Sequence, residues 1–323
     1  TGAFGNSTVV NFDNGYDAFA IDNSLRTLAD RPGRDAQRSD VASLDATWPL
    51  AGDLDLRSIT TWAESDIEVS FDGDWGNDAD WGDAGPYDYF SRTLRNRRTL
   101  SQDLRLASGG AGGSSWTAGA WWLRLEESND IADDGLYLED AFERQFDSDY
   151  RADSVALYGQ AQWSPAPATT IAAGLRLEQR DARYDDSDGS DFDPRDRLWG
   201  GDLTVTQRLS DTQNLWASLS RGYRAGGFNI GTSVPPARQQ FDDEYLWSLE
   251  LGWKGRNRQG DRTADVNFFY TRRERPQVST SIQLDPQDPL TFIFLTDNAA
   301  DAEAWGIESS AQLRLTDRVE IGA

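Results

Sequence analysis

The 323-residue chain contains no cysteine, no histidine and no methionine. Without cysteine there are no disulfides, no thiolate nucleophile and no zinc-finger or iron–sulfur site. Without histidine there is neither a Ser-His-Asp triad nor a His-ligated metal site. The composition therefore argues against most classes of enzyme, and we expect no catalytic residues, no bound metal, no cofactor and no nucleic-acid partner.

Long hydrophobic runs are also missing. No apolar stretch approaches the roughly 18 residues that a membrane helix needs, and no signal peptide is visible at Thr1. A strand of a membrane β-barrel needs only about ten residues of alternating polarity, so the mean hydropathy of -0.66 does not argue against a membrane protein. The lack of an initiator methionine predicts a processed or excised piece of a longer protein.

The most informative stretch is 214–229, NLWASLSRGYRAGGFN, followed by 241–254, FDDEYLWSLELGWK. In the first part alternate residues are apolar, which is typical of a strand with two unlike faces. The second part alternates more strictly and has aromatic residues at both ends of its apolar face. Trp and Tyr rings settle at the two headgroup levels of a bilayer, so this pattern predicts a strand that crosses a membrane.

These stretches, with NFFY at 267–270, resemble the barrel of TonB-dependent outer-membrane receptors. The resemblance extends to SQDLRLAS at 101–108, VALYGQAQ at 155–162, GLRLE at 174–178 and NAADAEAWGIE at 298–308. It covers most of the chain from about Arg38 onward, and the order and spacing of the motifs carry it more than any one of them. A second interpretation of Gly222, Gly226 and Gly227 is that they only relieve a strand end and a turn.

Apolar alternation along the chain is interrupted by gaps of two alternating lengths. Short gaps rich in turn residues fall at 51–53, 108–114, 164–168, 210–213, 255–261 and 316–317. Long gaps fall between them, at 72–88, 129–149, 181–196, 225–240 and about 277–299. Short turns at one end and long loops at the other are typical of an outer-membrane barrel, with turns in the periplasm and loops outside.

The gaps delimit a series of predicted strands. They are 38–50, 54–71, 89–107, 115–128, 151–163, 169–180, 197–209, 214–224, 241–254, 262–275, 301–315 and a last one that begins at Arg318. We predict an all-β fold, an antiparallel transmembrane β-barrel that is partial, with about 12 of roughly 22 strands. We expect 1–37 to be a strand remnant and extracellular loop, and 38–323 to be part of the receptor barrel, with the plug domain and the C-terminal strands absent.

The face of each strand that meets lipid follows from the cost of burying charge. In 169–180 one face carries Leu175 and Leu177, and the other carries Arg176, Glu178 and Arg180. Turning the charged face to lipid would cost up to about 2 to 4 kcal/mol for each Arg near the midplane, so we expect the leucines to face outward. The same argument assigns to the outward face Trp121, Leu123, Leu125, Trp305, Ile307, Ala311 and Leu313, and to the inward face Trp122, Arg124, Glu126, Glu308, Gln312 and Arg314. Alternation alone does not exclude a soluble β-sandwich, which would bury its apolar faces.

Charge is unevenly distributed. The gaps 72–88, 129–149 and 181–196 carry six, eight and seven acidic residues, which suits solvated loops or, on a sharper interpretation, divalent-cation binding. The acidic run 185–191 does not have EF-hand spacing. Arginines gather near the predicted outer strand ends, at Arg92, Arg95, Arg97, Arg98, Arg221, Arg224, Arg272, Arg273 and Arg275. They could form a rim for an anionic ligand, or they could pair with the loop acids.

The resemblance implies a plugged barrel in the outer membrane of a Gram-negative bacterium, and not an enzyme. It implies uptake of scarce bulky nutrients, most often ferric siderophore complexes, with energy relayed by TonB. The implied partners are the ferric ligand, TonB through the missing N-terminal region, and outer-membrane lipid around a monomeric barrel. For ligand binding we predict Arg221, Tyr223, Arg224, Phe228 and Asn229. By strict alternation Arg221 shares a face with Leu215, so it lies above the lipid boundary or follows a bulge, whereas Arg224 faces inward.

Three alternatives remain. A passive porin would have the same strand pattern, but RGYRAGGFN and NAADAEAWGIE argue against it. A soluble carbohydrate-binding β protein would use Trp75, Trp81, Trp116 or Trp199 as sugar platforms, and would partition into buffer rather than detergent. An enzyme fits least, since no acid/base pair stands out among the carboxylates.

Overall fold

The computed structural model describes residues 29–74, 87–110, 113–137, 140–231, 234–287, 292–316 and 318–322. The chain divides into two compact units. Unit 1 comprises 1–39, 65–97 and 128–148, and unit 2 comprises 40–64, 98–127 and 149–323. No helix among the described residues is long and apolar enough to cross a membrane.

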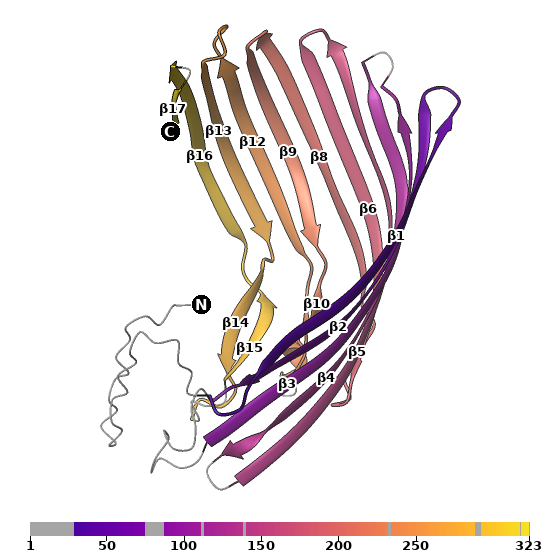
Figure 1. Ribbon diagram of the computed structural model, residues 1–323, viewed down its shortest axis with the longest axis vertical. Helices are drawn as coiled ribbons and strands as arrows, with labels where there is room; N and C mark the ends of the chain where they lie inside the picture. Colours follow the sequence, from indigo (N-terminus) through magenta and orange to yellow (C-terminus); the bar gives the residue numbers. More distant parts are fainter. Residues whose placement is uncertain are drawn as a thin grey trace. The chain divides into compact units, whose positions relative to one another are not determined.

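The main sheet has 13 strands, of which β7 pairs only with β6 and the other twelve follow one another in sequence order. These are β1 (Arg34–Leu50), β2 (Leu54–Asp72), β3 (Tyr87–Ser108), β4 (Ser115–Tyr137), β5 (Asp140–Ala166), β6 (Thr169–Asp186), β8 (Arg195–Ser210), β9 (Gln213–Arg224), β12 (Glu244–Arg256), β13 (Arg262–Glu274), β16 (Ala302–Thr316) and β17 (Val319–Gly322). β7 is Asp191–Phe192. Within unit 2, β6, β8, β9, β12, β13 and β16 lie side by side (Figure 1). The predicted antiparallel all-β architecture is confirmed.

Two small hairpins extend from the main sheet of unit 2. β10 (Gly227–Phe228) pairs with β11 (Gln240–Phe241) in the connection between β9 and β12, which also contains a single 3-10 turn at Pro236–Arg238. β14 (Gln277–Gln283) pairs with β15 (Phe292–Asn298) in the connection between β13 and β16. Two of the predicted long loops therefore have strand structure of their own.

The predicted gap at 129–149 is wrong. β4 continues to Tyr137 and β5 begins at Asp140, so this acidic stretch is a hairpin of strands. Its alternation is carried by small and polar residues as well as by apolar ones, since Phe146 is 1% exposed and Ser148 is also buried. Asp147 and Asp149 alternate with these buried residues and are exposed to water. The density of acidic residues predicted a loop there, but the two-residue alternation of a strand continues through it.

Smaller differences fall at other strand ends. β1 starts at Arg34 rather than at residue 38, and β6 continues to Asp186 through part of the predicted gap 181–196. The proposed N-terminal segment 1–37 lies mostly outside the described residues, which start at residue 29. Its division from the rest of the chain stays a prediction.

Outward and inward faces can be assigned in unit 2 from exposure. On β6, Leu175 and Leu177 are 52% and 51% exposed. The side chain of Glu178, the next residue along the strand, is only 11% exposed. The outward series continues across neighbouring strands in register, because Leu203 lies opposite Leu219, which lies opposite Leu249. A row of exposed leucines that continues from strand to strand is what a lipid-facing surface requires. The assignment predicted for 169–180 is confirmed.

The face assignment predicted for β4 is wrong. Arg124 donates to Asp153 at 2.8 Å. Asp153 lies on the same, outward face of β5 as the strongly exposed residues Val155 and Leu157. Trp121, predicted to face outward, lies under the guanidinium of inward Arg176, with 4.7 Å from the guanidinium carbon to the ring centroid. Arg124 can face outward because the carboxylate on the next strand neutralises it. That partner is not visible in the local sequence.

Candidate functional site

The longer connections of unit 2 lie together at one end of its strands. They are 225–243 and 275–301, and the short turns at 167–168, 211–212 and 257–261 lie at the opposite end (Figure 1). We call the first of these the loop end. All five residues predicted to bind ligand belong to it, either at the end of β9 or in the hairpin beyond.

Arg221 lies on the outward face among three aromatic rings. Its guanidinium carbon is 3.9 Å from the ring centroid of Trp199, 3.8 Å from that of Tyr245 and 5.5 Å from that of Trp247. A guanidinium over aromatic faces is held by cation–π attraction, and it also donates a hydrogen bond to the carbonyl of Trp199. The register from Leu215 to Arg221 is regular, so Arg221 shares the face of Leu215 without a bulge between them.

Tyr223 contacts the inward residues of β6. Its hydroxyl donates to Glu178 at 2.8 Å and accepts from Nε of Arg176 at 2.9 Å. Arg176 and Glu178 are themselves paired at 2.7 Å. Arg221 and Tyr223 are two residues apart, yet they reach opposite faces, so strict alternation fails between them.

A glycine on the neighbouring strand accounts for this failure. The β8–β9 pairing ends at Gly201 opposite Arg221, and a Cβ placed on Gly200 would lie 2.9 Å from the carbonyl oxygen of Arg221 and 3.2 Å from the ring of Tyr223. Because Gly200 has no side chain, the backbone and the Tyr223 ring can pack against it. The Gly200-Gly201 pair was the available signal in the sequence, but it lies more than twenty residues from Tyr223.

Arg224 is exposed and stands opposite Glu244 in the β9–β12 register. Glu244 is 8% exposed, and its carboxylate accepts from Arg273 at 2.6 Å and from the backbone N–H of Gln277 at 2.8 Å. Within the described part of the chain Arg224 makes no hydrogen bond or ion pair. It is the member of the predicted set whose guanidinium is free to meet a ligand.

Phe228 is a packing residue. Its ring stacks on Tyr184 at 4.9 Å and on Phe192 at 5.9 Å, and it meets Tyr150 edge-on at 5.9 Å. Tyr184 is fully buried. The cluster joins β10 to β5, β6 and β7, so Phe228 fixes the start of the 225–243 connection.

Asn229 connects two loops through its side chain. The side-chain amide donates to the carbonyls of Arg238 and Thr296, both at 2.7 Å, and its oxygen accepts from the backbone N–H of Thr296 at 2.7 Å. These bonds join the 225–243 connection to β15 through a side chain. The five predicted residues thus fall into different environments, and Phe228 and Asn229 shape the site rather than present free groups.

A polar cavity of about 190 Å³ lies beside this turn, lined among others by Arg180, Asp196, Gly226 and Asp242. Arg180 pairs with Asp196 at 2.8 Å, donates to the carbonyl of Gly226 at 3.2 Å and contacts the hydroxyl of Tyr150. A Cβ on Gly226 would lie 2.5 Å from the carbonyl oxygen of Phe241, so this glycine is required for the close approach of two backbones. Sequence reasoning placed Arg180 on the inward face but did not assign it to a site.

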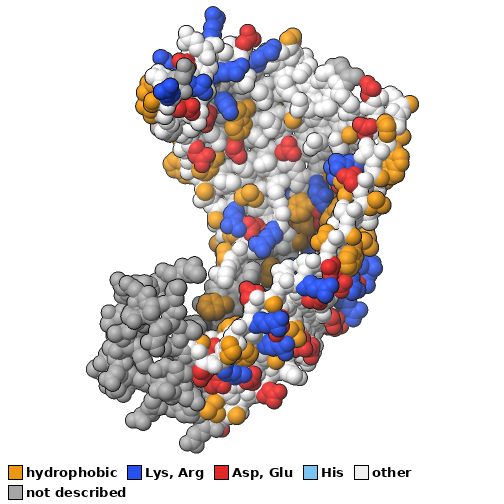
Figure 2. All heavy atoms as spheres, viewed as in Figure 1, with side chains coloured by type: hydrophobic (Ala, Val, Ile, Leu, Met, Phe, Trp, Pro, Cys, Tyr) orange, Lys and Arg blue, Asp and Glu red, His pale blue; other side chains and the backbone are white. Residues whose placement is uncertain are grey.

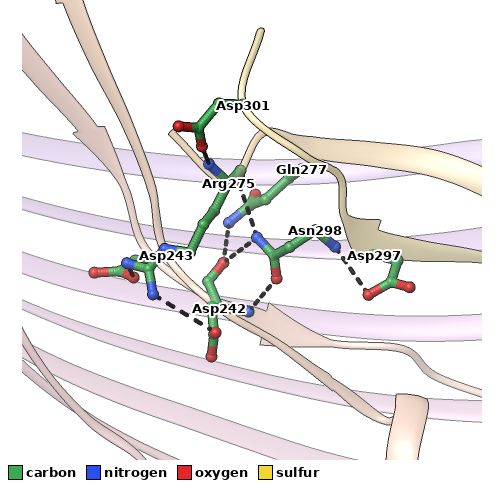
Figure 3. A network of polar contacts seen from close by, with 7 residues as sticks. All are labelled: Asp242, Asp243, Arg275, Gln277, Asp297, Asn298 and Asp301. Atoms are coloured by element: carbon green, nitrogen blue, oxygen red, sulfur yellow. Dashed lines mark hydrogen bonds and ion pairs between the residues drawn. The ribbon is translucent and has the colours of Figure 1, made fainter. Parts of the chain in front are cut away.

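A second polar cluster anchors the β14–β15 hairpin (Figure 3). Arg275, which has a positive φ of 53°, contacts Asp243 and lies 3.6 Å from Asp242. The side-chain amide of Asn298 donates to the carbonyls of Arg275 and Asp242, at 2.8 and 3.1 Å. Gln277 donates to the carbonyl of Asp242 at 2.9 Å. Side-chain amides therefore take the place of a β ladder where the two connections meet.

Asp301 completes this cluster from the start of β16. It accepts from Arg272 at 2.8 Å and from the backbone N–H of Arg275. The Arg272 guanidinium, and after it this backbone N–H, hold the pKa of the Asp301 carboxyl below its ordinary value. The carboxylate stays charged at neutral pH and fixes the end of β13 to the start of β16.

A family model described as "TonB dependent receptor-like, beta-barrel" matches residues 1–322. The chain belongs to the TonB-dependent receptor β-barrel family. This is an outer-membrane family of Gram-negative bacteria whose members are transport receptors and not enzymes. The resemblance noted in the sequence is thereby confirmed.

Solved structures of several uptake receptors and transporters have the same fold. The ferric yersiniabactin uptake receptor FyuA from Yersinia pestis is 20% identical, with a TM-score of 0.64 over 87% of this chain and 40% of that one. The copper transporter OprC is 14% identical, with a TM-score of 0.65 over 90% of this chain and 46% of that one. The ferric-catecholate import receptor Fiu from E. coli K12 is 13% identical, with a TM-score of 0.58 over 88% and 46%. The chain spans less than half the length of these proteins, and at this identity the likeness concerns the fold.

The arginines of this receptor chain form ion pairs at strand ends. Arg92 pairs with Glu68 at 3.0 Å, Arg98 with Glu64 at 2.7 Å and Arg273 with Glu244 at 2.6 Å. Figure 2 shows blue and red side chains intermixed on the visible face. Ion pairing is confirmed for Arg92, Arg98, Arg272, Arg273 and Arg275, and their partners lie on neighbouring strands or in the connections 225–243 and 275–301. Among the described residues Arg221 and Arg224 have no ion pair.

The acidic run 185–191 of this receptor chain forms a hydrogen-bonded turn. Asp186 accepts from the Tyr184 hydroxyl and from the backbone N–H of Ser190, both at 2.9 Å. Among the described residues no group of three or more acidic, His or Cys side chains is placed to hold a metal ion. Local hydrogen bonding therefore accounts for Asp186 without a cation.

The tryptophans considered as sugar platforms have different positions. Trp75 and Trp81 lie outside the described residues. Trp199 is engaged with Arg221 and Trp247, whose ring centroid lies 5.8 Å away. Trp116 remains partly exposed at the turn end of β4. Family membership favours a receptor over a soluble lectin-like protein.

Proposed function

We propose that this chain forms part of the wall of an outer-membrane receptor that captures a ferric siderophore, or a ligand of similar size and charge, and imports it with energy from TonB. The observation that supports this most is the coexistence, on the same strands, of a lipid-facing row of leucines and a polar loop end where Arg224 is unpaired. Membership of the TonB-dependent receptor family also supports this proposal.

The chemistry of the loop end suits an anionic iron chelate. Arg224 offers a planar guanidinium that can bind a carboxylate or a catecholate oxygen with two hydrogen bonds. The cavity at Arg180 and Gly226 lies on the adjacent strand ends, and backbone groups there add donors and acceptors. The nearby acids are neutralised by Arg273, Arg275 and Arg272, so they do not repel a negative ligand at full strength.

The proposal includes the partners implied by the family. TonB would contact a part of the receptor other than these strands, outer-membrane lipid would surround the outward leucines, and the barrel would act as a monomer. The solved proteins with this fold are named after different ligands, ferric yersiniabactin in one case and copper in another. The fold alone therefore does not determine the ligand.

The test combines binding with energised uptake. The purified receptor is titrated with ferric complexes of catecholate, hydroxamate and hydroxycarboxylate chelators, with quenching of tryptophan fluorescence as the signal. Uptake of labelled iron is then measured in cells with and without functional TonB. We expect one class to bind at submicromolar to micromolar concentration and its uptake to stop without TonB. Uptake that continues without TonB would support a passive porin, and saturable binding of oligosaccharides alone would support a lectin.

A further inference from the structure

The edge of β8 that faces β9 is open at the loop end. β8 pairs with β6 as far as Arg195, but its pairing with β9 stops at Gly201, opposite Arg221. β9 itself continues to Arg224, paired with β12. None of the described strands takes the place of β9 beside the rest of β8. The polar cavity of about 190 Å³ borders this open edge, because Arg195 and Gly226 both line it.

Backbone groups of β8 point across the open edge. The N–H of Ala182 in β6 donates to the carbonyl of Pro194 at 3.0 Å, and the β6–β8 register that follows is regular. In an antiparallel pair the N–H and C=O of one residue point to the same side, and successive residues alternate. Even-numbered residues of β8 therefore bond to β6, whereas Arg197 and Trp199 point their N–H and C=O toward β9. In the paired part of the two strands, odd-numbered residues of β9 lie opposite odd-numbered residues of β8 and point back at them.

Side chains bond to groups that a ladder would satisfy. The Arg221 guanidinium donates to the carbonyl of Trp199. The side-chain amide of Gln277 donates to the carbonyl of Ala225 at 2.9 Å. A backbone carbonyl that loses its ladder partner needs another donor, and these two side chains supply it.

The β8–β9 register can be continued without an inserted residue. By the same step it pairs three further residues of each strand, Gly200 with Gly222, Trp199 with Tyr223 and Arg197 with Ala225. The first pair has no side chains, and a Cβ on Gly222 would meet nothing within 4 Å. In the continued ladder the Trp199 carbonyl would bond to the N–H of Tyr223. The Ala225 carbonyl would bond to the N–H of Arg197, so each carbonyl would exchange a side-chain donor for a backbone donor.

The side chain of Tyr223 holds the end of β9 out of this ladder. Its ring lies against Gly200, 3.2 Å from where a Cβ would be, and its hydroxyl bonds to Glu178 and Arg176 on the inward side. In the continued ladder alternation would place Tyr223 on the face of Arg221. Closing the ladder therefore costs the two hydroxyl bonds and uncovers two charged groups on the inward face.

We propose that this edge is a two-state seam, formed by residues 195–200 of β8 and residues 222–226. In the state of this structure the seam is open and is held by the side chains of Tyr223, Arg221 and Gln277. In the second state the ladder continues through the seam and Tyr223 turns outward. The two states satisfy the same backbone carbonyls by different donors, so they differ by few hydrogen bonds and a small free-energy change moves the population.

The seam connects the inward wall with the loop end. Closing it moves Ala225 toward β8, and with it the start of the connection that carries the β10–β11 hairpin. At the same time Arg176 and Glu178 are uncovered on the inward face, because the Tyr223 hydroxyl leaves them. A change on either side of the wall therefore biases the other. The seam needs no ligand to close, so it is separate from the proposed uptake function.

The test measures how often the seam closes, as the rate of disulfide formation in the purified full-length receptor in detergent, without ligand. This chain has no cysteine, so paired substitutions report on chosen positions. Arg197→Cys with Ala225→Cys is the in-register pair, whose Cα atoms are about 5.5 Å apart in the ladder, within disulfide range. Leu203→Cys with Leu219→Cys is the reference pair, because these residues lie opposite each other in this structure. Arg195→Cys with Ala225→Cys is the out-of-register pair, displaced by two residues from the ladder.

We expect the reference pair to form its disulfide rapidly and the in-register pair slowly, but faster than the out-of-register pair. Tyr223→Phe should raise the in-register rate about tenfold, because the population of a rare state rises by the factor that one charge-assisted hydrogen bond supplies. Tyr158→Phe is the matched control, because its hydroxyl donates to Asp103 at 2.7 Å, away from the seam, and the rate should not change. Gln277→Ala, which releases the Ala225 carbonyl, should also raise the rate.

Gln277→Ala carries the test if Tyr223→Phe fails to fold, which is judged by the electrophoretic mobility shift on heating. Three results would overturn the proposal. They are an in-register pair no faster than the out-of-register pair, equal rates in Tyr223→Phe and Tyr158→Phe, or an in-register pair as fast as the reference pair in the otherwise wild-type receptor. None of these measurements uses the ferric ligand, so failure of the uptake function leaves the result unaffected.

Discussion

The strands of unit 2 and the connections at their loop end are held by different kinds of interaction. From the short turns up to Arg224, β9 and β12 pair residue by residue, and leucines such as Leu215, Leu219, Leu249 and Leu251 point outward. Beyond Arg224 the chain depends on individual side chains, such as Asn229 and Asn298, that bond to backbone groups of another connection. The first region depends mainly on the alternation of polar and apolar residues, whereas the second depends on particular side chains.

The largest effect is expected where the period is broken. Leu249→Arg places a charge on the outward face opposite Leu219, which costs up to about 2 to 4 kcal/mol near the membrane midplane. We expect most of the folded barrel to be lost, measured as the fraction whose electrophoretic mobility shifts on heating. Ser248→Arg is the matched control, because the next residue faces inward, where water solvates the charge. Equal losses in the two variants would contradict the membrane assignment.

At the loop end a single arginine is expected to affect ligand binding without affecting the fold. Arg224→Ala should weaken binding of an anionic ferric chelate by about 1.5 to 3 kcal/mol, the range for a charge-assisted hydrogen bond. Arg208→Ala is the control, because Arg208 lies at the turn end and donates to the carbonyl of Pro167. The dissociation constant is measured by fluorescence titration. An unchanged value for Arg224→Ala would remove this residue from the site.

The connections are expected to loosen locally when one amide is removed. Asn229→Ala leaves the backbone N–H and carbonyl of Thr296 without their partner, at a cost of about 1 to 3 kcal/mol. Amide hydrogen exchange at Thr296 should accelerate while exchange in β9 and β12 stays as in the wild type. Asn257→Ala, in a short turn, should leave Thr296 unchanged. Acceleration throughout β9 in Asn229→Ala would show that the two regions are not independent.

The smallest effect concerns pH. The folded-state pKa of Asp301 is lowered by Arg272 and by the backbone N–H of Arg275, so its contribution to stability is present above the ordinary Asp pKa of about 3.9. That contribution is lost as the pH falls through the folded-state value. Exchange at the amide of Arg275, which donates to Asp301, should therefore be constant from neutral pH to about 4, after correction for intrinsic rates, and should accelerate below it. Asp301→Asn should remove this transition, and an identical transition in that variant would assign it to another group.

The comparison also explains what the sequence could predict. The outward face of β6 was predictable because Arg176 and Glu178 share one face and the leucines the other. The faces of β4 were not, because Trp121 and Trp122 give both faces aromatic character and the charge of Arg124 is neutralised by Asp153 on the next strand. A pairing between strands decides such a case, and it leaves no trace in the alternation of a single strand.

The candidate site was predictable in place but not in detail. RGYRAGGFN located the loop end, since a polar turn after an amphipathic strand must leave the membrane. The inward turn of Tyr223 depends on Gly200 in β8, and the cavity beside Gly226 depends on Arg180 in β6 and Asp242 before β12. These residues are far apart in sequence and meet only through the strand register. Packing contacts of this kind determine which side chains remain free, as for Arg224, and which become structural, as for Phe228.

The long, regular registers of β9, β12 and β13 have a mechanical consequence. Each neighbouring pair is joined over twelve consecutive residues. A force along the strand axis loads all hydrogen bonds of a pair in shear, and they must rupture together. A force that pulls a short turn away from the sheet peels the same bonds one at a time. The wall is therefore stiffest along its strands and weakest against peeling from its turns.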